Sequence, residues 1–210
     1  MVPVENKPSL IRSLPAALVV IRFLISPLLL WDAIDGQTSI WFISGYMIAF
    51  VSDIFDGIIA RRLNVSTAQL RQADSWADVC LYLCIAGSTW LTHSDIVIAF
   101  AVPLLLVVFV QLVWWVANLV KYGKPASYHT YSAKLWGITL FIATVALFGF
   151  NYAGLTLWLA ILVGIIHTLE EIGMTLLLPV WSHDVLSIVH AWELRKSSVT
   201  SSYAESKITA

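Results

Sequence analysis

The chain has 210 residues, of which 59% are hydrophobic and 12% are charged, and its formal net charge is −1. A soluble domain of this length carries about 25% charged residues. The composition therefore excludes an ordinary soluble globular protein. The balanced charge gives no reason to expect nucleic acid as a partner.

Six apolar blocks follow one another along the chain and predict an integral membrane protein. Each is roughly 17 to 26 residues long, enough for a helix to cross the ~30 Å core of a bilayer. Arg22 lies within the first block, and no small-residue cleavage site follows that block, so we expect a retained helix and not a signal peptide. The blocks span residues 14–31, 40–60, 73–91, 96–120, 132–150 and 155–180.

The placement of basic residues predicts the orientation of the helices. Eleven of the twelve Lys and Arg residues lie in the two terminal segments or in residues 61–71 and 121–134. Such an excess marks segments on the cytoplasmic side. We therefore expect an all-α polytopic membrane protein with six transmembrane helices and with both termini in the cytoplasm (N-in/C-in).

The chain is expected to form one membrane domain with short flanking segments. Residues 1–12 are a polar cytoplasmic lead, and residues 13–181 contain the six-helix transmembrane domain. Residues 182–210 are expected to form an interfacial helix followed by a disordered, serine-rich tail. That helix is predicted from apolar residues at helical spacing, namely Val185, Ile188, Val189 and Trp192.

Four aspartates in the second and third blocks are the strongest functional candidates, because an ionisable residue near the centre of a membrane helix costs about 2.5–3.5 kcal/mol or more. Asp53 and Asp56 are three residues apart, and Asp74 and Asp78 are four apart, so each pair shares a helix face. If the 61–72 loop makes the two helices antiparallel neighbours, the carboxylates converge. Oxygen ligands of this kind favour Mg²⁺, Mn²⁺ or Ca²⁺, and two bridged ions suit pyrophosphate chemistry.

A simpler interpretation is that these aspartates are helix-end charges balanced by Arg61, Arg62 and Arg71. The small residues Gly57 and Ala60 favour the functional interpretation, since they would let a bulky ligand lie against the helix backbone.

The spacing of these residues resembles the signature of the CDP-alcohol phosphotransferase family, which is Asp-x2-Asp-Gly-x2-Ala-Arg-x8-Gly-x3-Asp-x3-Asp. Seven of its eight fixed residues are present over 26 residues, and the six-helix organisation is similar as well. Leu70 stands where the family has glycine. In the first block Pro15 and Arg22 match the family pattern, whereas Ala16 and Val19 replace its polar residues. The matching residues are Asp53, Asp56, Gly57, Ala60, Arg61, Asp74 and Asp78.

The resemblance implies a phospholipid-biosynthetic transferase that moves a substituted phosphate from a CDP-linked donor, such as CDP-diacylglycerol, to a small alcohol and releases CMP. It implies a homodimer in the bacterial cytoplasmic membrane with its active site on the cytoplasmic face. Two Mg²⁺ or Mn²⁺ ions would be held by Asp53, Asp56, Asp74 and Asp78, with Asp78 also the general base. CDP would be bound by Asp53, Gly57, Ala60, Arg61 and Thr67.

Further polar residues have no place in that signature. Lys134, with Lys121, Lys124, His129, Tyr131 and Ser132 nearby, is a candidate for binding a phosphate-bearing acceptor. The alternative is ordinary positive-inside charge with snorkelling lysines. His167, Glu170 and Glu171 interrupt the sixth block, where we expect them to face inward and to pair with Arg22 or Lys134, or to help bind the acceptor.

Three other functions compete with the transferase. A catalytically silent scaffold that binds metal or nucleotide is suggested by Leu70, Ala16 and Val19. An ion-coupled transporter would place its carboxylates near the membrane midplane, not at one end of the helices. A prenyltransferase would carry aspartate-rich repeats that this chain lacks.

Overall fold

The computed structural model describes residues 13–63, 65, 67–124, 128, 130–182 and 185–197. Helices are the only regular secondary structure among these residues, which confirms the predicted all-α class. The predicted lead at 1–12, His129 and the predicted tail from residue 198 lie outside the described residues.

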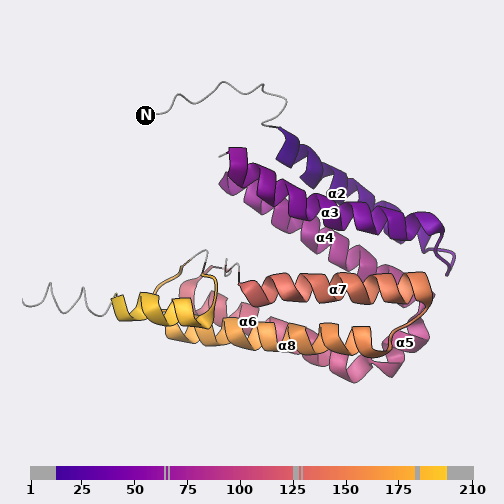
Figure 1. Cartoon of the computed structure of the whole chain (residues 1–210). Coiled ribbons are helices and arrows are strands. Elements are labelled where there is room, and N and C mark those ends of the chain that lie inside the picture. The colour runs from indigo at the N-terminus through magenta and orange to yellow at the C-terminus, as the bar shows by residue number, and fades with distance from the viewer. Residues whose placement is uncertain are drawn as a thin grey trace, which may run out of the picture. The chain divides into compact units, whose positions relative to one another are not determined.

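Each apolar block corresponds to a long helix, and only the fourth is interrupted. It divides at Phe100, and Pro103 lies in the first turn of the helix that follows, where a missing N–H is tolerated. The helices are α2 (Leu14–Asp32), α3 (Ile40–Leu63), α4 (Ala68–Thr92), α5 (Ser94–Ala99), α6 (Ala101–Tyr122), α7 (Tyr131–Phe150) and α8 (Gly154–Leu177) (Figure 1).

Five of the described helices are long and apolar enough to cross a membrane: α2, α3, α6, α7 and α8. The chain is therefore an integral membrane protein. Helix α4 is long enough but less apolar, because polar residues such as Asp74, Asp78 and Ser88 occur along it. The count of six spans and the N-in/C-in orientation are not confirmed and stay predictions.

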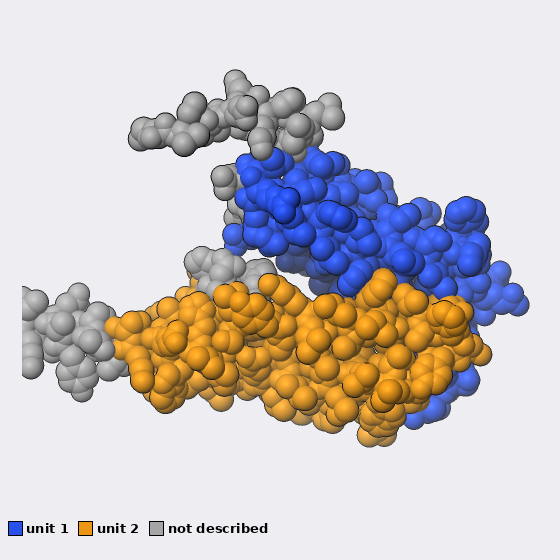
Figure 2. All heavy atoms as spheres, viewed as in Figure 1, with its two compact units in different colours: residues 1–99 blue, residues 100–210 orange. Residues whose placement is uncertain are grey.

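The chain divides into two compact units, residues 1–99 and 100–210, which are coloured separately in Figure 2. In the first unit α2 packs against both α3 and α4. The buried residues of α2 repeat every three or four positions and so form one stripe along the helix. They are Pro15, Val19, Arg22, Ser26 and Leu29, and the arginine is the only charged member.

In the second unit α8 packs against α6 and α7. The last carbonyls of α8 are satisfied by two side chains from the end of α6. Lys121 Nζ donates to the carbonyl oxygens of Thr175 (2.7 Å) and Leu176 (3.0 Å), and Tyr122 Oη donates to that of Leu178 (2.7 Å). Lys121 thus caps a helix.

A further helix at residues 188–197 follows α8 in the region where the sequence predicts one, and its interfacial position stays a prediction. Val185 and Ala191 are fully buried and pack with Met174 and Leu178 at the end of α8. Val185 precedes the helix and does not belong to it, so the predicted helix began too early. The Ile188 N–H donates to Glu170 Oε1 at 3.1 Å, which satisfies one of the open amides at the new helix's N-terminus.

Close packing of α8 against α7 predicts the effect of adding a methyl group at Gly164. A Cβ there would lie 2.5 Å from Trp136 Nε1, whereas a Cβ at Gly137 would meet nothing within 4 Å. We expect Gly164→Ala to destabilise the second unit by about 1–3 kcal/mol through overpacking. Gly137→Ala, the matched control, should leave the melting temperature in detergent unchanged or raise it. An equal response of the two variants would contradict this packing.

The contact between Glu170 and Ile188 predicts how the 188–197 helix is held. Glu170→Ala should speed hydrogen exchange at the first amides of this helix by about tenfold, because the side-chain acceptor of the Ile188 N–H is lost. Glu170→Gln keeps an acceptor oxygen and should show most of the protection. Unchanged exchange in the alanine variant would mean that burial of Val185 and Ala191 alone holds the helix.

Candidate metal centre and a second polar cluster

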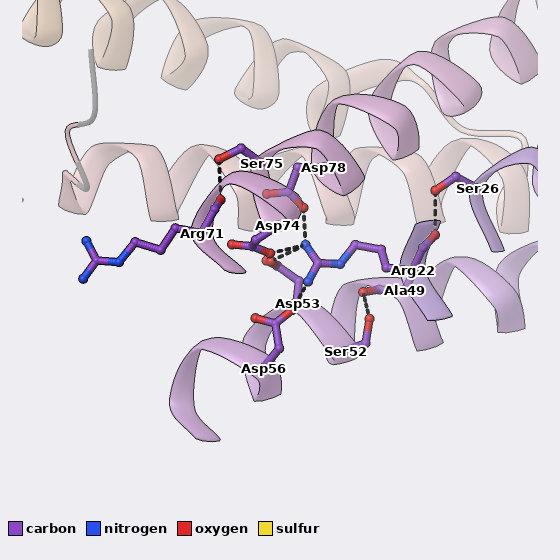
Figure 3. Close-up of polar contacts among 10 residues, drawn as sticks. All are labelled: Arg22, Ser26, Ala49, Ser52, Asp53, Asp56, Arg71, Asp74, Ser75 and Asp78. Atoms are coloured by element: carbon purple, nitrogen blue, oxygen red, sulfur yellow. Dashed lines mark hydrogen bonds and ion pairs between the residues drawn. The ribbon is translucent and has the colours of Figure 1, made fainter. Parts of the chain in front are cut away.

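The four candidate aspartates converge, as the sequence predicts, and we call them the aspartate cluster. Asp53 and Asp56 come from α3, and Asp74 and Asp78 come from α4. Arg22, on the buried stripe of α2, contacts all four (Figure 3). Its Nη1 donates to Oδ1 of Asp53 (2.8 Å), of Asp74 (2.9 Å) and of Asp78, and its Nη2 donates to Oδ2 of Asp56.

The cluster has a buried side and an open side. The Arg22 side chain is 0% exposed and that of Asp56 is 6% exposed, whereas those of Asp53, Asp74 and Asp78 are 36–42% exposed. Arg22 uses one oxygen of each carboxylate, which leaves the second oxygen of each outside these contacts. Oxygens at a partly open surface are accessible to a ligand from solution.

The donor set fits a divalent cation. Asp53, Asp56 and Asp74 each offer a carboxylate oxygen, and these three oxygens lie within 4.8 Å of one another. Carboxylate oxygens are the ligands that Mg²⁺ and related hard cations prefer. These three residues can therefore hold a metal ion, while Asp78 joins them through its contact with Arg22.

The route by which the carboxylates meet differs from the expected one. The sequence suggested direct pairing of two antiparallel helices, but the close helix pairs here are α2 with α3 and α2 with α4. Sequence reasoning also missed the role of Arg22, which we expected to pair with the sixth block. The sequence did contain a signal for this role. A basic residue within an apolar block needs carboxylates as partners, and the second and third blocks carry four.

Gly57 and Arg61 lie on the same side of α3. A Cβ added at Gly57 would be 3.5 Å from Arg61 Nη1, an ordinary contact, so the arginine side chain lies over the glycine. Arg61 is exposed, and Ala60 beside it is buried. Gly57 thus gives α3 a small-residue surface with the Arg61 guanidinium over it.

Thr67 has a structural role that the sequence did not predict. It is the N-cap of α4, and its Oγ1 accepts a hydrogen bond from the Leu70 N–H at 3.2 Å. Threonine is a preferred residue at this position. Thr67, a candidate nucleotide residue, and Leu70, which departs from the family pattern, therefore both lie at the start of α4.

The second unit holds a separate group of polar side chains at α7 and α8, which we call the α7–α8 polar cluster: Thr130, Ser132, His167, Glu170 and Glu171. Thr130 Oγ1 donates to Glu171 Oε1 at 3.2 Å, and Ser132 Oγ donates to Glu170 Oε2 at 2.5 Å. His167 Nδ1 lies 3.8 Å from Glu171 Oε1 and 3.3 Å from Ser132 Oγ. The described partners of the two glutamates are hydroxyl groups, the Ile188 amide and His167, and not the expected Lys134.

Lys134 is exposed at the start of α7. Its Nζ lies 5.4 Å from the centre of the Tyr131 ring. Lys124 lies similarly over Trp181, at 5.6 Å. Neither ammonium group belongs to the α7–α8 polar cluster, and acceptor binding by Lys134 stays a prediction.

Comparison with known proteins agrees with the geometry. The family model for CDP-alcohol phosphatidyltransferase matches residues 12–166, a range that contains Arg22, the aspartate cluster, Gly57, Arg61 and Thr67. The searches of curated proteins and of solved structures gave no match. The family match covers most of the chain, and members of this family are phosphotransferases of phospholipid biosynthesis that act on CDP-alcohols. The chain therefore belongs to the CDP-alcohol phosphatidyltransferase family and is a membrane-embedded transferase.

Proposed function

We propose that this protein transfers the phosphatidyl group of CDP-diacylglycerol to a small alcohol and releases CMP. The observation that carries the proposal is the aspartate cluster, in which four carboxylates from two helices meet at the positions of the family signature. Its partly exposed side gives a charged headgroup access to the carboxylates. A lipid donor could keep its acyl chains in the bilayer.

The aspartate cluster would hold two Mg²⁺ or Mn²⁺ ions. Bound there, such ions neutralise charge on a pyrophosphate and on the departing CMP. Three of the aspartates already place their oxygens within 4.8 Å of one another, which supports their assignment as ligands. Asp78 completes the set and contacts the same arginine.

Asp78 is the general base of the proposed reaction. Its carboxylate takes the proton of the acceptor hydroxyl as that oxygen forms a bond to the phosphorus of the phosphatidyl group. The bond between this phosphorus and the CMP oxygen breaks, and CMP leaves with the bonding electrons. Partial exposure of the Asp78 side chain, at 37%, supports access by an acceptor.

The nucleotide part of the donor is assigned to Asp53, Gly57, Ala60, Arg61 and Thr67. The small residues allow close approach to α3, and the exposed Arg61 guanidinium suits a phosphate oxygen. Lys134 is assigned to the acceptor, where its exposed ammonium would bind a phosphate-bearing alcohol.

The setting is proposed from the distribution of charge. Six spans with both termini in the cytoplasm would place the basic segments, and with them the active site, on the cytoplasmic face of a bacterial membrane. The catalytic domain would be residues 13–181, followed by an interfacial segment, and the working form would be a homodimer.

A second candidate is a catalytically silent protein that binds metal or nucleotide. Val19 replaces a polar residue of the family and is buried on the α2 stripe, where it offers no polar contact to a donor. Leu70 replaces a glycine in the first turn of α4. The first change would remove a polar contact to the donor, and the second would crowd the nucleotide, while the aspartate cluster is left intact.

Release of CMP from CDP-diacylglycerol tests the proposed reaction. The wild-type protein would be assayed with Mn²⁺ and with each acceptor alcohol of a panel in turn. It should release CMP only with the alcohol that is its acceptor. Asp78→Asn should lower the rate by about 10²–10⁴-fold, the usual contribution of a general base. Asp35→Asn is the matched control, because Asp35 is exposed and accepts from the Gln37 amide, so it should retain the wild-type rate.

CDP-choline in place of CDP-diacylglycerol identifies the donor in the same assay. If neither donor yields CMP with any acceptor while Mn²⁺ still binds, the silent protein is the better description. Equal loss in Asp78→Asn and Asp35→Asn would contradict the role of Asp78.

A further inference from the structure

We propose that Arg22 is the positioning residue of the metal centre: its guanidinium orders the aspartate cluster by holding one oxygen of each carboxylate, and the second oxygen of each carboxylate is left for metal binding. The inference rests on the proposed function for the identity of the ligands, and it assigns a role to a residue on a helix that supplies none of them.

The geometry of the contacts supports this role. A guanidinium group is planar and carries donors in a fixed fork, so it can hold several carboxylates in set orientations. Arg22 binds Oδ1 of Asp53, Asp74 and Asp78 and Oδ2 of Asp56, one oxygen per residue (Figure 3). Each carboxylate is thereby fixed at one oxygen, and its second oxygen takes no part in the contacts with Arg22.

The packing of α2 keeps Arg22 in this place. The residue is fully buried, and its neighbours on the stripe, Val19 and Ser26, are buried as well. Ser26 Oγ donates to the Arg22 carbonyl oxygen at 2.8 Å. Moving the side chain away from the carboxylates would leave an unpaired charge inside the unit, which is strongly unfavourable. Arg22 therefore stays with the cluster when a metal binds.

The charge of the group also suits this arrangement. With all four carboxylates ionised, the aspartate cluster carries −4 and Arg22 reduces this to −3. Two divalent cations would bring the total to +1, which matches an anionic pyrophosphate. Without the arginine, repulsion would push the carboxylates apart before a metal arrives. Partners that orient metal ligands typically contribute about 10- to 100-fold to metal affinity.

Direct measurement of Mn²⁺ binding tests the proposal. The full-length protein in detergent would be titrated with Mn²⁺, and the free ion would be followed by electron paramagnetic resonance. Arg22→Gln should weaken binding by about 10- to 100-fold. Arg22→Lys keeps the positive charge but lacks the forked donors of the guanidinium, so its Mn²⁺ affinity should lie between those of the wild type and Arg22→Gln. Arg62→Gln, an exposed arginine at the end of α3, should bind as the wild type does.

A split in the kinetics separates positioning from a general loss of structure. In CMP release, Arg22→Gln should need more Mn²⁺ for half-maximal rate and should approach the wild-type rate at saturating Mn²⁺. If the glutamine variant fails to fold, as judged by gel filtration and circular dichroism, the lysine variant decides. If folded Arg22 variants bind Mn²⁺ as tightly as the wild type, or more tightly, the guanidinium competes with metal and the proposal is wrong.

The same experiment distinguishes this inference from the proposed function. Weaker Mn²⁺ binding in the Arg22 variants of a protein that releases no CMP would support the positioning role and contradict the transferase. A wild-type protein that binds no Mn²⁺ would overturn the positioning role, whatever its activity.

Discussion

The first unit depends on one buried guanidinium and the four carboxylates that surround it. A helix with an apolar stripe can bury an arginine only if opposite charges satisfy it, because an unpaired buried charge costs several kcal/mol or more. Arg22 obtains its partners from α3 and α4 together. The interaction that lets α2 pack against these two helices is thus the interaction that assembles the candidate metal centre.

The buried polar groups of the second unit are satisfied by different partners. Its glutamates are paired with hydroxyl groups and a backbone amide, and the carbonyls at the end of α8 are satisfied by side chains of α6. The two units therefore satisfy their buried polar groups in different ways: a guanidinium is central to the contacts of the aspartate cluster, whereas hydroxyls and a backbone amide contact the glutamates of the α7–α8 polar cluster.

The sequence predicted the parts of this protein that depend on local pattern. Long apolar blocks become long helices because backbone groups in a bilayer must be satisfied within the helix. Aspartates three or four residues apart share a helix face because an α-helix has 3.6 residues per turn. Which helix lies closest to which is a matter of tertiary packing, so the pairing of Arg22 with the aspartate cluster was missed. The N-cap role of Thr67 and the hydroxyl partners of Glu170 and Glu171 depend equally on neighbours that no spacing specifies.

Lys121, in the last turn of α6, also helps to fix where two helices end. Its ammonium is hydrogen-bonded to the last carbonyls of α8, and Tyr122 bonds to the same helix end, so α6 and α8 finish at one level. Two helices fixed in this way cannot slide past each other along their axes. In a bilayer thinner or thicker than their apolar length, they must tilt as a pair. Hydrophobic mismatch would then change the tilt of both helices together.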